Sequence, residues 1–153
     1  MIEKIISGGQ TGADQGGLDA AIDAGVPHGG WCPSGRRSET GPIPDRYQLT
    51  EMDSVDYPPR TRRNVAESDG TVVFTFGVLE RGSLLTMRLC EERKKPSLWI
   101  DLTKDAEAAP ARIKTWVESH RIKTINVAGN RESKSPGIQK MVWAIMVLVL
   151  MVD

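Results

Sequence analysis

The first strand-to-helix turn of this chain reads Ser7-Gly8-Gly9-Gln10-Thr11-Gly12-Ala13-Asp14-Gln15-Gly16-Gly17. It separates residues 2–6, which predict a strand, from residues 18–24, which predict a helix that ends at Gly25 and Pro27. A glycine-dense turn of this kind exposes backbone N–H groups at the positive end of a helix, where phosphate and other oxyanions bind. The stretch therefore predicts a strand–turn–helix unit that binds an anionic small molecule.

The same turn also has a structural explanation, because tight turns between strands and helices need glycine for backbone reasons alone. Thr11 and Asp14 suit the role of N-cap residues equally well. The turn is not G-x-G-x-x-G, and no acidic residue stands at the end of a second strand to hold a ribose hydroxyl, which disfavours an ordinary NAD site. Both explanations of the turn stay open at this point.

Composition limits the class of protein. With 153 residues, the chain is expected to form one domain spanning residues 1–153. Its 20 basic and 20 acidic residues cancel, which argues against a general nucleic-acid binder or a membrane-surface binder. Cys32 and Cys90 form no C-x-x-C pair, and Glu3 and Lys4 interrupt any apolar start, so we expect a cytoplasmic protein without a signal peptide.

Residues 141–152 are apolar at every position. A helix that crosses a bilayer needs about 20 such residues, so this run is too short to span a membrane. A helix that is apolar on all sides must be covered, either by its own fold or by another copy of the chain. Packing within the fold is the simpler explanation, but we expect part of this surface to form the contact of a homodimer or higher even oligomer. The face expected there consists of Val142, Ile145, Met146 and Val149.

Strand and helix patterns alternate along the rest of the chain. Strands are predicted at residues 26–33, 71–76, 97–102 and 124–128, and helices at residues 60–69, 82–95 and 108–120, with a last helix that begins at Pro136 behind a capping Ser135. This alternation predicts an α/β, three-layer Rossmann-like fold with a mainly parallel sheet of about five strands and helices on both faces. Residues 28–59 read as a long polar loop, which we expect to cover the ring of a ligand.

Ligands of such sheets bind beyond the carboxyl ends of the strands, and three loops of this chain begin helices there. The loops are residues 8–17, residues 77–83 with Thr86 one turn later, and residues 129–135. Each places glycines, hydroxyls or an arginine at a helix N-terminus, so together they predict one anion site. The candidate binding residues are Gly8, Gly9, Gln10, Thr11, Gly12, Asp14, Arg36, Arg60, Asn64, Gly82, Ser83, Thr86, Gly129, Arg131 and Ser133.

The second loop has the Gly-x-x-x-x-Gly spacing of a P-loop, but Ser83 stands where the lysine should be. Without that lysine the β- and γ-phosphates lose their charge partner, which excludes a Walker-type ATPase. Arg36 and Arg60 are long enough to reach a phosphate bidentately. Because Arg60 and Asn64 are four residues apart, we expect them to share a helical face and to point together into the site.

The sequence supports neither a metal site nor a known catalytic triad. His28 and Cys32 are two candidate ligands, and two ligands do not make a metal site. No Ser-His-Asp order or paired-carboxylate arrangement is evident. The carboxylates with potential access to the crevice are Asp14, Asp19, Glu39 and Glu80. Of these, Asp14 and Glu80 are the candidate bases that could activate water.

At these residues the chain resembles the molybdenum cofactor carrier family, a circularly permuted branch of the Rossmann-like superfamily that includes the lonely-guy phosphoribohydrolases and DNA-processing protein A. The resemblance covers nearly the whole chain. It runs through Ser7 to Gly12 with Asp14, Leu18 and Asp19; Gly29 to Pro33 with Gly35, Arg36 and Glu39; Tyr57, Arg60, Thr61, Asn64, Val65, Ser68 and Asp69; Gly82, Ser83 and Thr86; and Asn126 to Gly129, Arg131, Ser133 and Pro136 to Ile138.

The resemblance implies a phosphorylated ligand, either the molybdenum cofactor, which is a pterin, or a nucleotide. The superfamily also implies a second hypothesis, a nucleoside monophosphate N-glycosidase in which Asp14 or Glu80 activates water. Gly8 to Gly12 inverts the Thr-Gly order of the phosphoribohydrolase motif, and this departure counts against inherited hydrolase activity. The sequence therefore favours a binding protein over an enzyme, and a module for assembly through the apolar tail is a third hypothesis.

Overall fold

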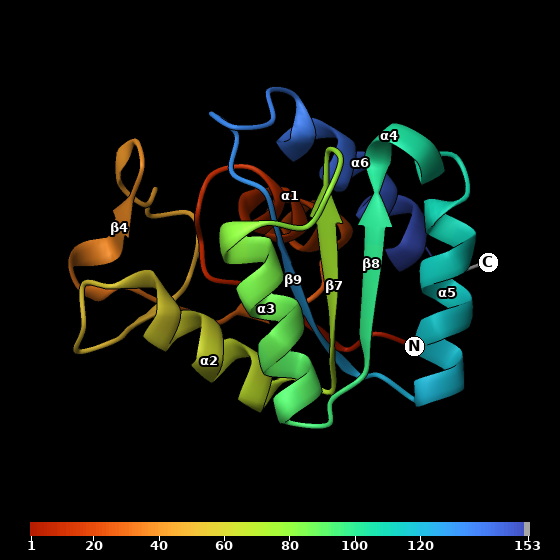
Figure 1. Ribbon diagram of the computed structural model, residues 1–153, viewed down its shortest axis with the longest axis horizontal. Coiled ribbons are helices and arrows are strands. Elements are labelled where there is room, and N and C mark those ends of the chain that lie inside the picture. The colour runs from red at the N-terminus through yellow and green to blue at the C-terminus, as the bar shows by residue number, and fades with distance from the viewer. Residues whose placement is uncertain (152–153) are drawn as a thin grey trace.

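A five-stranded parallel sheet forms the centre of the computed structural model, which describes residues 1–151. The strand order is β2-β1-β9-β7-β8, and every neighbouring pair is parallel. This arrangement confirms the predicted α/β Rossmann-like fold (Figure 1). The strands are β1 (Lys4–Ile6), β2 (His28–Gly29), β7 (Gly70–Thr75), β8 (Ser97–Asp101) and β9 (Thr124–Gly129).

Helices cover both faces of the sheet. Figure 1 shows α3 in front of the sheet, with α1 and α6 behind it. The helix α2 packs on α3, whereas α1 and α5 both pack on α6. The helices are α1 (Ala13–Ala24), α2 (Tyr57–Glu67), α3 (Arg81–Glu92), α4 (Leu102–Asp105), α5 (Ala109–His120) and α6 (Ile138–Leu150).

The strand β7, which lies between β9 and β8, is buried at every residue, because helices pack on both faces of the sheet. Its middle residues, Val72 to Phe74, are correspondingly apolar in succession rather than in alternation. Phe74, its register partner Ile100 on β8, and Val127 on β9 are fully buried in the main core. Each such side chain contributes roughly 1.5–3 kcal/mol to folding. The core therefore fixes the strand ends from which the loops emerge.

The helix α1 begins at Ala13, earlier than the sequence predicts, so that the last five residues of the glycine-rich stretch are helical. Gly12 is its N-cap, and Gly25 ends it in the left-handed conformation as expected. A Cβ at Gly16 would lie 2.6 Å from the carbonyl oxygen of Gln139, and one at Gly17 would lie 2.7 Å from Cβ of Val127. These two glycines let α1 pack closely on α6 and β9.

Two other helix starts differ from the prediction. The helix α2 begins at Tyr57 and holds both prolines in its first turn, where a missing N–H costs nothing. The helix α6 begins at Ile138 with Gly137 as its N-cap, not at Pro136 behind Ser135. The carboxylate of Glu132 caps it, because it accepts the backbone N–H groups of Gly137 and Gln139 at 2.7 and 3.0 Å.

The prediction that one particular face of α6 forms a subunit contact is wrong. Val142, Ile145, Met146 and Val149 are buried in the chain's own core, where they pack with residues of the sheet, α1 and α5. The opposite face carries the exposed apolar surface, and Leu148 there is 49% exposed. Among residues 1–151, no helix is both long and apolar enough to cross a membrane.

Residues 28–59 are more ordered than a polar loop. They form two small sheets, and Ile43 and Tyr47 pack with Leu18 of α1 and Cys32 in a separate small core. This core fixes the segment beside the glycine-rich turn. Its short elements are β3 (Trp31–Cys32) paired with β6 (Thr50–Glu51), β4 (Arg37–Ser38) paired with β5 (Gly41–Pro42), and the 3₁₀ turn η1 (Ser34–Arg36).

Candidate functional site

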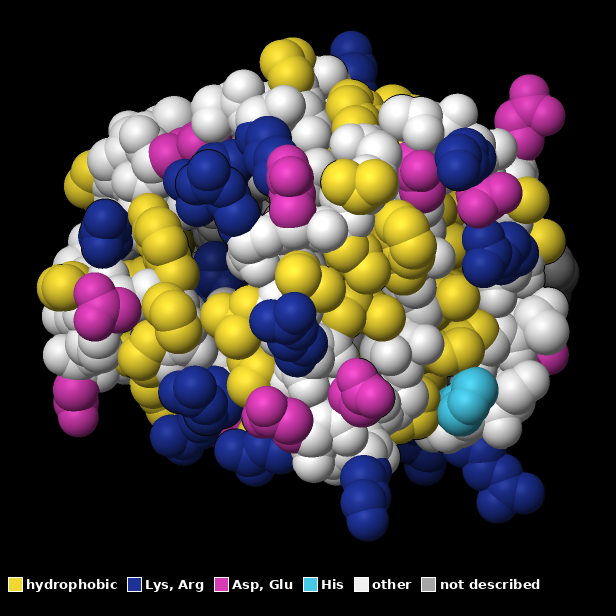
Figure 2. All heavy atoms as spheres, in the orientation of Figure 1, with side chains coloured by type: hydrophobic (Ala, Val, Ile, Leu, Met, Phe, Trp, Pro, Cys, Tyr) yellow, Lys and Arg dark blue, Asp and Glu magenta, His cyan; other side chains and the backbone are white. Residues whose placement is uncertain are grey.

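A cavity of about 650 Å³ lies at the carboxyl ends of β7 and β9, where α3 begins. All three loops that the sequence singles out contribute to it, together with the first turns of α2. Lysine and arginine side chains surround a hollow beside the N-terminal end of α3 (Figure 2). The lining residues are Gln10, Asp14, Tyr57, Pro58, Arg60, Thr61, Glu80, Arg81, Gly82, Ser83, Leu85, Thr86, Ala128, Gly129, Asn130, Arg131 and Lys134.

The charge of this crevice is positive. Two of its cations face carboxylates, since Lys134 lies 2.5 Å from Glu80 and Arg60 lies 3.6 Å from Asp14. Arg131 lies 4.0 Å from a carboxylate outside the lining, and its side chain is 44% exposed. The crevice therefore suits an anionic ligand. Its charged residues are Arg60, Arg81, Arg131 and Lys134 against Asp14 and Glu80.

Most backbone N–H groups of the glycine-rich turn are not free for a ligand, contrary to the expectation from its sequence. The N–H groups of residues 9–13 are all paired within the protein. They donate to the Ser7 hydroxyl, the Asp14 carboxylate, the Gln10 side-chain oxygen, the Gln139 side-chain oxygen and the Asn130 carbonyl, in that order, at 3.0–3.3 Å. The turn is held together by its own side chains and by the loop after β9.

The glycines of this turn serve close packing instead. Gly12 has a φ of 84°, and a Cβ there would lie 2.4 Å from the carbonyl oxygen of Asn130. Gly9 has a φ of 79° and would meet the side chain of Leu49. A Cβ at Gly8 would lie 2.5 Å from Nε of Arg60, so the missing side chain makes room for the guanidinium.

Gln10 is the side chain that the turn presents to the crevice. Its Oε1 accepts the backbone N–H groups of Thr11 and Glu39, each at 3.0 Å, which fixes the orientation of the amide. Its Nε2 has no partner, although the residue is only 6% exposed. Nε of Arg60 is the other buried side-chain atom without a partner among residues 1–151. A buried unpaired donor costs about 1–3 kcal/mol, so an acceptor from a ligand would stabilise both.

The two candidate bases have different surroundings. Asp14 is buried, and burial raises the pKa of its carboxyl, although the charge of Arg60 acts in the opposite direction. Glu80 is exposed, and hydrogen bonding to Lys134 lowers the pKa of its carboxyl. Asp14 therefore takes up a proton more readily than an ordinary aspartate, whereas Glu80 stays ionised.

The N-terminus of α3 forms one wall of the crevice. Ser83 and Thr86 line it, but their hydroxyls donate to the backbone carbonyls of Glu80 and Gly82 at 2.8 and 2.9 Å. No heavy atom lies within 4 Å of a Cβ built at Gly82. This wall thus offers the positive end of the helix dipole and open space rather than free hydroxyls.

The loop after β9 supplies the opposite wall. Gly129 has a φ of 149°, and a Cβ there would lie 2.1 Å from the carbonyl oxygen of Phe74, so only glycine fits. Arg131 lines the crevice, whereas Ser133 turns toward Glu39, whose carboxylate it holds. Glu39 lies at the rim with Thr11, which donates its hydroxyl to it.

Seven of the fifteen predicted binding residues do not line the crevice: Gly8, Gly9, Thr11, Gly12, Arg36, Asn64 and Ser133. The Arg36 guanidinium donates to three backbone carbonyls of residues 28–59 at 2.8–3.1 Å, and so stabilises that segment. The Asn64 side chain bonds the backbone N–H and carbonyl of Trp31 at 2.8 and 2.9 Å. The expectation that Arg60 and Asn64 point together into the site is therefore wrong, because Asn64 fastens α2 to β3.

The sequence also left out residues that line the crevice. Arg81 and Lys134 lie in the loops that it singled out, and their position at the start of a helix was the available signal. The sequence points to Tyr57 only through the family resemblance. Its ring lies 5.5 Å from the Arg60 guanidinium and 5.7 Å from that of Arg131, so it spaces the two cations.

His28 and Cys32 both have structural roles in the protein. Nε2 of His28 accepts the backbone N–H of Gln48 at 3.0 Å, and Cys32 is buried in the small core. In the part of the chain that the structure describes, no three histidine, cysteine, aspartate or glutamate residues are grouped as metal ligands.

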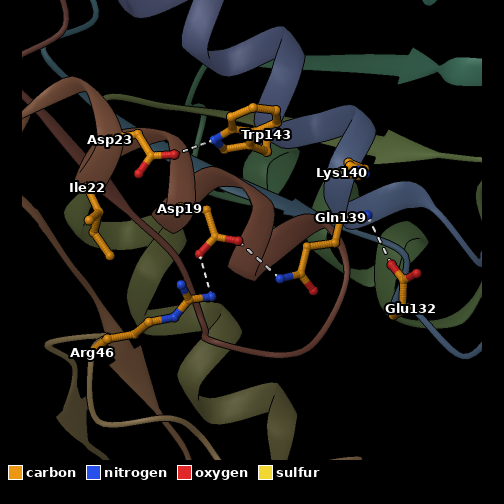
Figure 3. A pocket seen from close by; sticks show the side chains of 8 residues that line it. All are labelled: Asp19, Ile22, Asp23, Arg46, Glu132, Gln139, Lys140 and Trp143. Carbon is orange, nitrogen blue, oxygen red and sulfur yellow. Dashed lines mark hydrogen bonds and ion pairs between the residues drawn. The ribbon is translucent and has the colours of Figure 1, made fainter.

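A second cavity, of about 550 Å³, lies between α1, α6 and residues 28–59. Figure 3 shows Asp19 between Arg46, at 2.9 Å, and Gln139, at 3.1 Å. Asp19 also accepts the Tyr47 hydroxyl at 2.6 Å, so its carboxylate fastens residues 28–59 to the two helices. Asp19 therefore does not face the crevice. The lining is Asp19, Ile22, Asp23, Arg46, Glu132, Gln139, Lys140 and Trp143.

Comparison with known proteins agrees with the predicted resemblance. Residues 5–150 match the circularly permutated YpsA SLOG family. The chain is 46% identical to the "Putative molybdenum carrier protein" of Syntrophus aciditrophicus SB, whose crystal structure it matches with a TM-score of 0.95 over 98% of this chain and 96% of that one. A search of curated proteins found no match. The chain therefore belongs to the circularly permutated YpsA SLOG family.

Proposed function

We propose that the chain binds a phosphorylated small molecule, nucleotide-like or pterin, in the crevice between the N-terminus of α3 and the loop after β9. The observation that carries this proposal is the pair of buried donors, Nε2 of Gln10 and Nε of Arg60, beside a cavity lined by an excess of cations. Such donors indicate a missing acceptor. A phosphate supplies several acceptor oxygens together with the charge that the cations match.

The comparison supports a carrier rather than an enzyme. The relative from Syntrophus aciditrophicus has a name that refers to molybdenum carriage, and its similarity extends over the whole of this fold. We therefore propose the molybdenum cofactor, a phosphorylated pterin, as the first ligand to test and a nucleotide as the second. Polar donors line a cavity of about 650 Å³ that is large enough for either.

Thermal unfolding tests the proposal, because a ligand that binds the folded state alone raises Tm. The panel consists of nucleotides, pterin phosphates and molybdate, each phosphorylated compound being compared with its dephosphorylated form. We expect phosphorylated forms to raise Tm by several degrees and dephosphorylated forms to do so much less. Equal shifts for both forms would show that the crevice does not recognise phosphate.

We propose N-glycosidic hydrolysis of a nucleoside monophosphate as the second candidate function, which the surroundings of Asp14 favour. Its carboxyl lines the crevice, and burial raises its pKa toward the range that acid–base catalysis uses. Glu80 is a weaker candidate, since it is exposed and paired with Lys134. Release of free base from a panel of nucleoside monophosphates, lost in Asp14→Asn and retained in Glu80→Gln, is the expected result. Absence of release at high protein concentration would exclude this function.

We propose that the chain is a homodimer or a higher even oligomer through the outer face of α6. Leu148 and Ala144 are exposed on this face, and Trp143 and Val147 are partly buried beside them. We expect Leu148→Lys to lower the mass measured by light scattering, and Lys104→Ala, at an exposed position of α4, to leave it unchanged. A wild-type monomer at high concentration would exclude an oligomer.

We propose a cytoplasmic location from the state of the two cysteines. Cys32 and Cys90 are unpaired and belong to separate hydrophobic clusters, and burial raises the pKa of both thiols. Unpaired thiols suit a reducing compartment. Cell fractionation with an antibody against the native chain tests this location, and recovery outside the cytoplasm would contradict it.

A further inference from the structure

The carboxylate of Glu39 lies in surroundings that resemble a binding site for a ligand anion. Its oxygens accept the Ser133 backbone N–H at 3.1 Å, the Ser133 hydroxyl at 2.5 Å and the Thr11 hydroxyl, and Nη1 of Arg131 lies 4.0 Å away. Two hydroxyls, a backbone N–H and a guanidinium are the groups that proteins use to hold phosphate oxygens. Here they hold an anion that belongs to the chain itself.

Glu39 is ionised in this position. Partial burial opposes the charge, but the hydrogen bonds from Ser133 and Thr11 hold the pKa of its carboxyl below its usual value. The groups around it thus favour a negative charge. A ligand anion placed there would receive the same hydrogen bonds and the same attraction from Arg131.

This carboxylate site adjoins the crevice. Arg131 lines the crevice and lies beside Glu39, and Gln10, which also lines the crevice, accepts the backbone N–H of Glu39 at 3.0 Å. A ligand phosphate bound beside Arg131 and Gln10 therefore lies next to the place that Glu39 fills. A second, neighbouring anionic group of the same ligand would have to compete with the Glu39 carboxylate.

The β4–β5 hairpin, which carries Glu39, is held in place weakly enough to move when a ligand binds. Glu39 and Thr40 form the turn between β4 and β5, which pair with only two residues each. A two-stranded hairpin of this size has little stability of its own and depends on its contacts with the rest of the protein. The contacts of Glu39 with Thr11 and Ser133 are such contacts, so their loss would release the tip of the hairpin.

We propose that the groups around Glu39 form a second anion subsite, which this carboxylate fills until a ligand with two adjacent anionic groups displaces it. The inference rests on the proposed function, since it adds a neighbouring subsite to the same crevice. It narrows the ligand class from phosphates in general to ligands with two adjacent anionic groups, of which a diphosphate is the simplest. Release of the β4–β5 hairpin accompanies binding of the second group.

Calorimetry with inorganic pyrophosphate and inorganic phosphate tests the subsite. Glu39→Gln keeps the shape of the side chain and removes the competing charge, so we expect pyrophosphate to bind about 10-fold tighter than to the wild type, corresponding to about 1.4 kcal/mol. Phosphate binding should change much less. The double variant Glu39→Gln with Ser133→Ala should lose most of the gain. Glu51→Gln, which removes a charge from the same segment away from the crevice, is the matched control and should bind both anions as the wild type does.

Hydrogen exchange of the wild type gives a second measurement that needs no variant. We expect pyrophosphate to speed the exchange of backbone amides in residues 37–41, and phosphate to leave it unchanged. If Glu39→Gln binds pyrophosphate no tighter, or exchange in the hairpin slows, Glu39 only ties the loops together and the subsite is overturned, while phosphate binding and the proposed function stand. If no phosphorylated compound binds any of these proteins, the proposed function fails as well.

Discussion

Two glycine-containing turns flank the crevice and differ in what they offer a ligand. In the turn before α1, the backbone N–H groups of residues 9–13 are all paired within the protein. After the second turn, in the first two residues of α3, Gly82 borders open space, and the cation Arg81 lines the cavity beside it. The turn with the more suggestive sequence is thus the more self-contained one. In this protein, the many glycines of a strand-to-helix turn indicate close packing. The donors available to a ligand are side chains around the cavity.

The self-contained turn serves the crevice indirectly. Gly8 makes room for the guanidinium of Arg60, and the backbone around Gln10 fixes its amide with one donor toward the cavity. The turn before α1 therefore acts as a rigid support, and the cations of α2, α3 and the loop after β9 face the ligand. This difference predicts that changes in the support act on stability, whereas changes in the cations act on binding.

The largest expected effect is that of Gly12→Ala on stability. Gly12 and Gly35 both have positive φ, 84° and 77°, but only Gly12 has a backbone oxygen where a Cβ would lie. Backbone strain alone should cost Gly35→Ala about 1–2 kcal/mol. Strain together with the overlap should cost Gly12→Ala more than about 3 kcal/mol in the free energy of unfolding. Urea denaturation measures both, and equal losses for the two variants would show that the turn is not the rigid support described above.

The second expected effect concerns binding. Arg131→Ser should weaken binding of a phosphorylated ligand about 10-fold or more, because it removes a cation from the wall of the crevice. Its side chain is 44% exposed, so the free energy of unfolding should change by less than about 0.5 kcal/mol. Arg62→Ser, an exposed arginine of α2 outside the crevice, is the control for the change of charge. Equal losses of affinity would indicate a nonspecific charge effect.

A smaller effect is expected from Asp14→Asn, and it separates the two candidate functions. Burial raises the pKa of Asp14, so its negative charge, which repels phosphate, appears as pH rises through that pKa. Affinity of the wild type relative to Asp14→Asn should therefore fall with rising pH, and the variant should bind a few-fold tighter at neutral pH. A binding protein gains from the substitution, whereas an N-glycosidase loses turnover. Calorimetry across the pH range, together with product assays, distinguishes the two functions. If Asp14→Asn binds more weakly than the wild type, and the wild type shows no turnover, both functions are contradicted.

The sequence predicted the sheet, the positions of its helices and the loops that meet at the crevice, because apolar runs and topology rules depend on local patterns and chain order. Contacts between distant parts of the chain could not be predicted, because no local pattern records them. The Gly12 N–H donates to the side-chain oxygen of Gln139, and the side chain of Asn64 bonds the backbone of Trp31. The subunit contact predicted on α6 is wrong for the same reason. The sequence of a helix that is apolar on every side does not indicate which side faces the core of its own chain. Val142, expected at the contact, is buried in that core.

The smallest expected effect is that of Gly8→Ala, and it sharpens the difference between support and ligand wall. A Cβ at Gly8 would lie 2.5 Å from Nε of Arg60, which belongs to a flexible side chain that can shift. Stability should therefore fall by less than about 1 kcal/mol, since the position needs no positive φ. The displaced guanidinium should weaken phosphate binding two- to three-fold. Gly82→Ala, at the N-terminus of α3 where a Cβ meets open space, should leave stability nearly unchanged. Calorimetry and urea denaturation of both variants measure these effects. A stability loss at Gly8 as large as that at Gly12 would mean that Arg60 is part of the rigid support rather than a side chain positioned for the ligand.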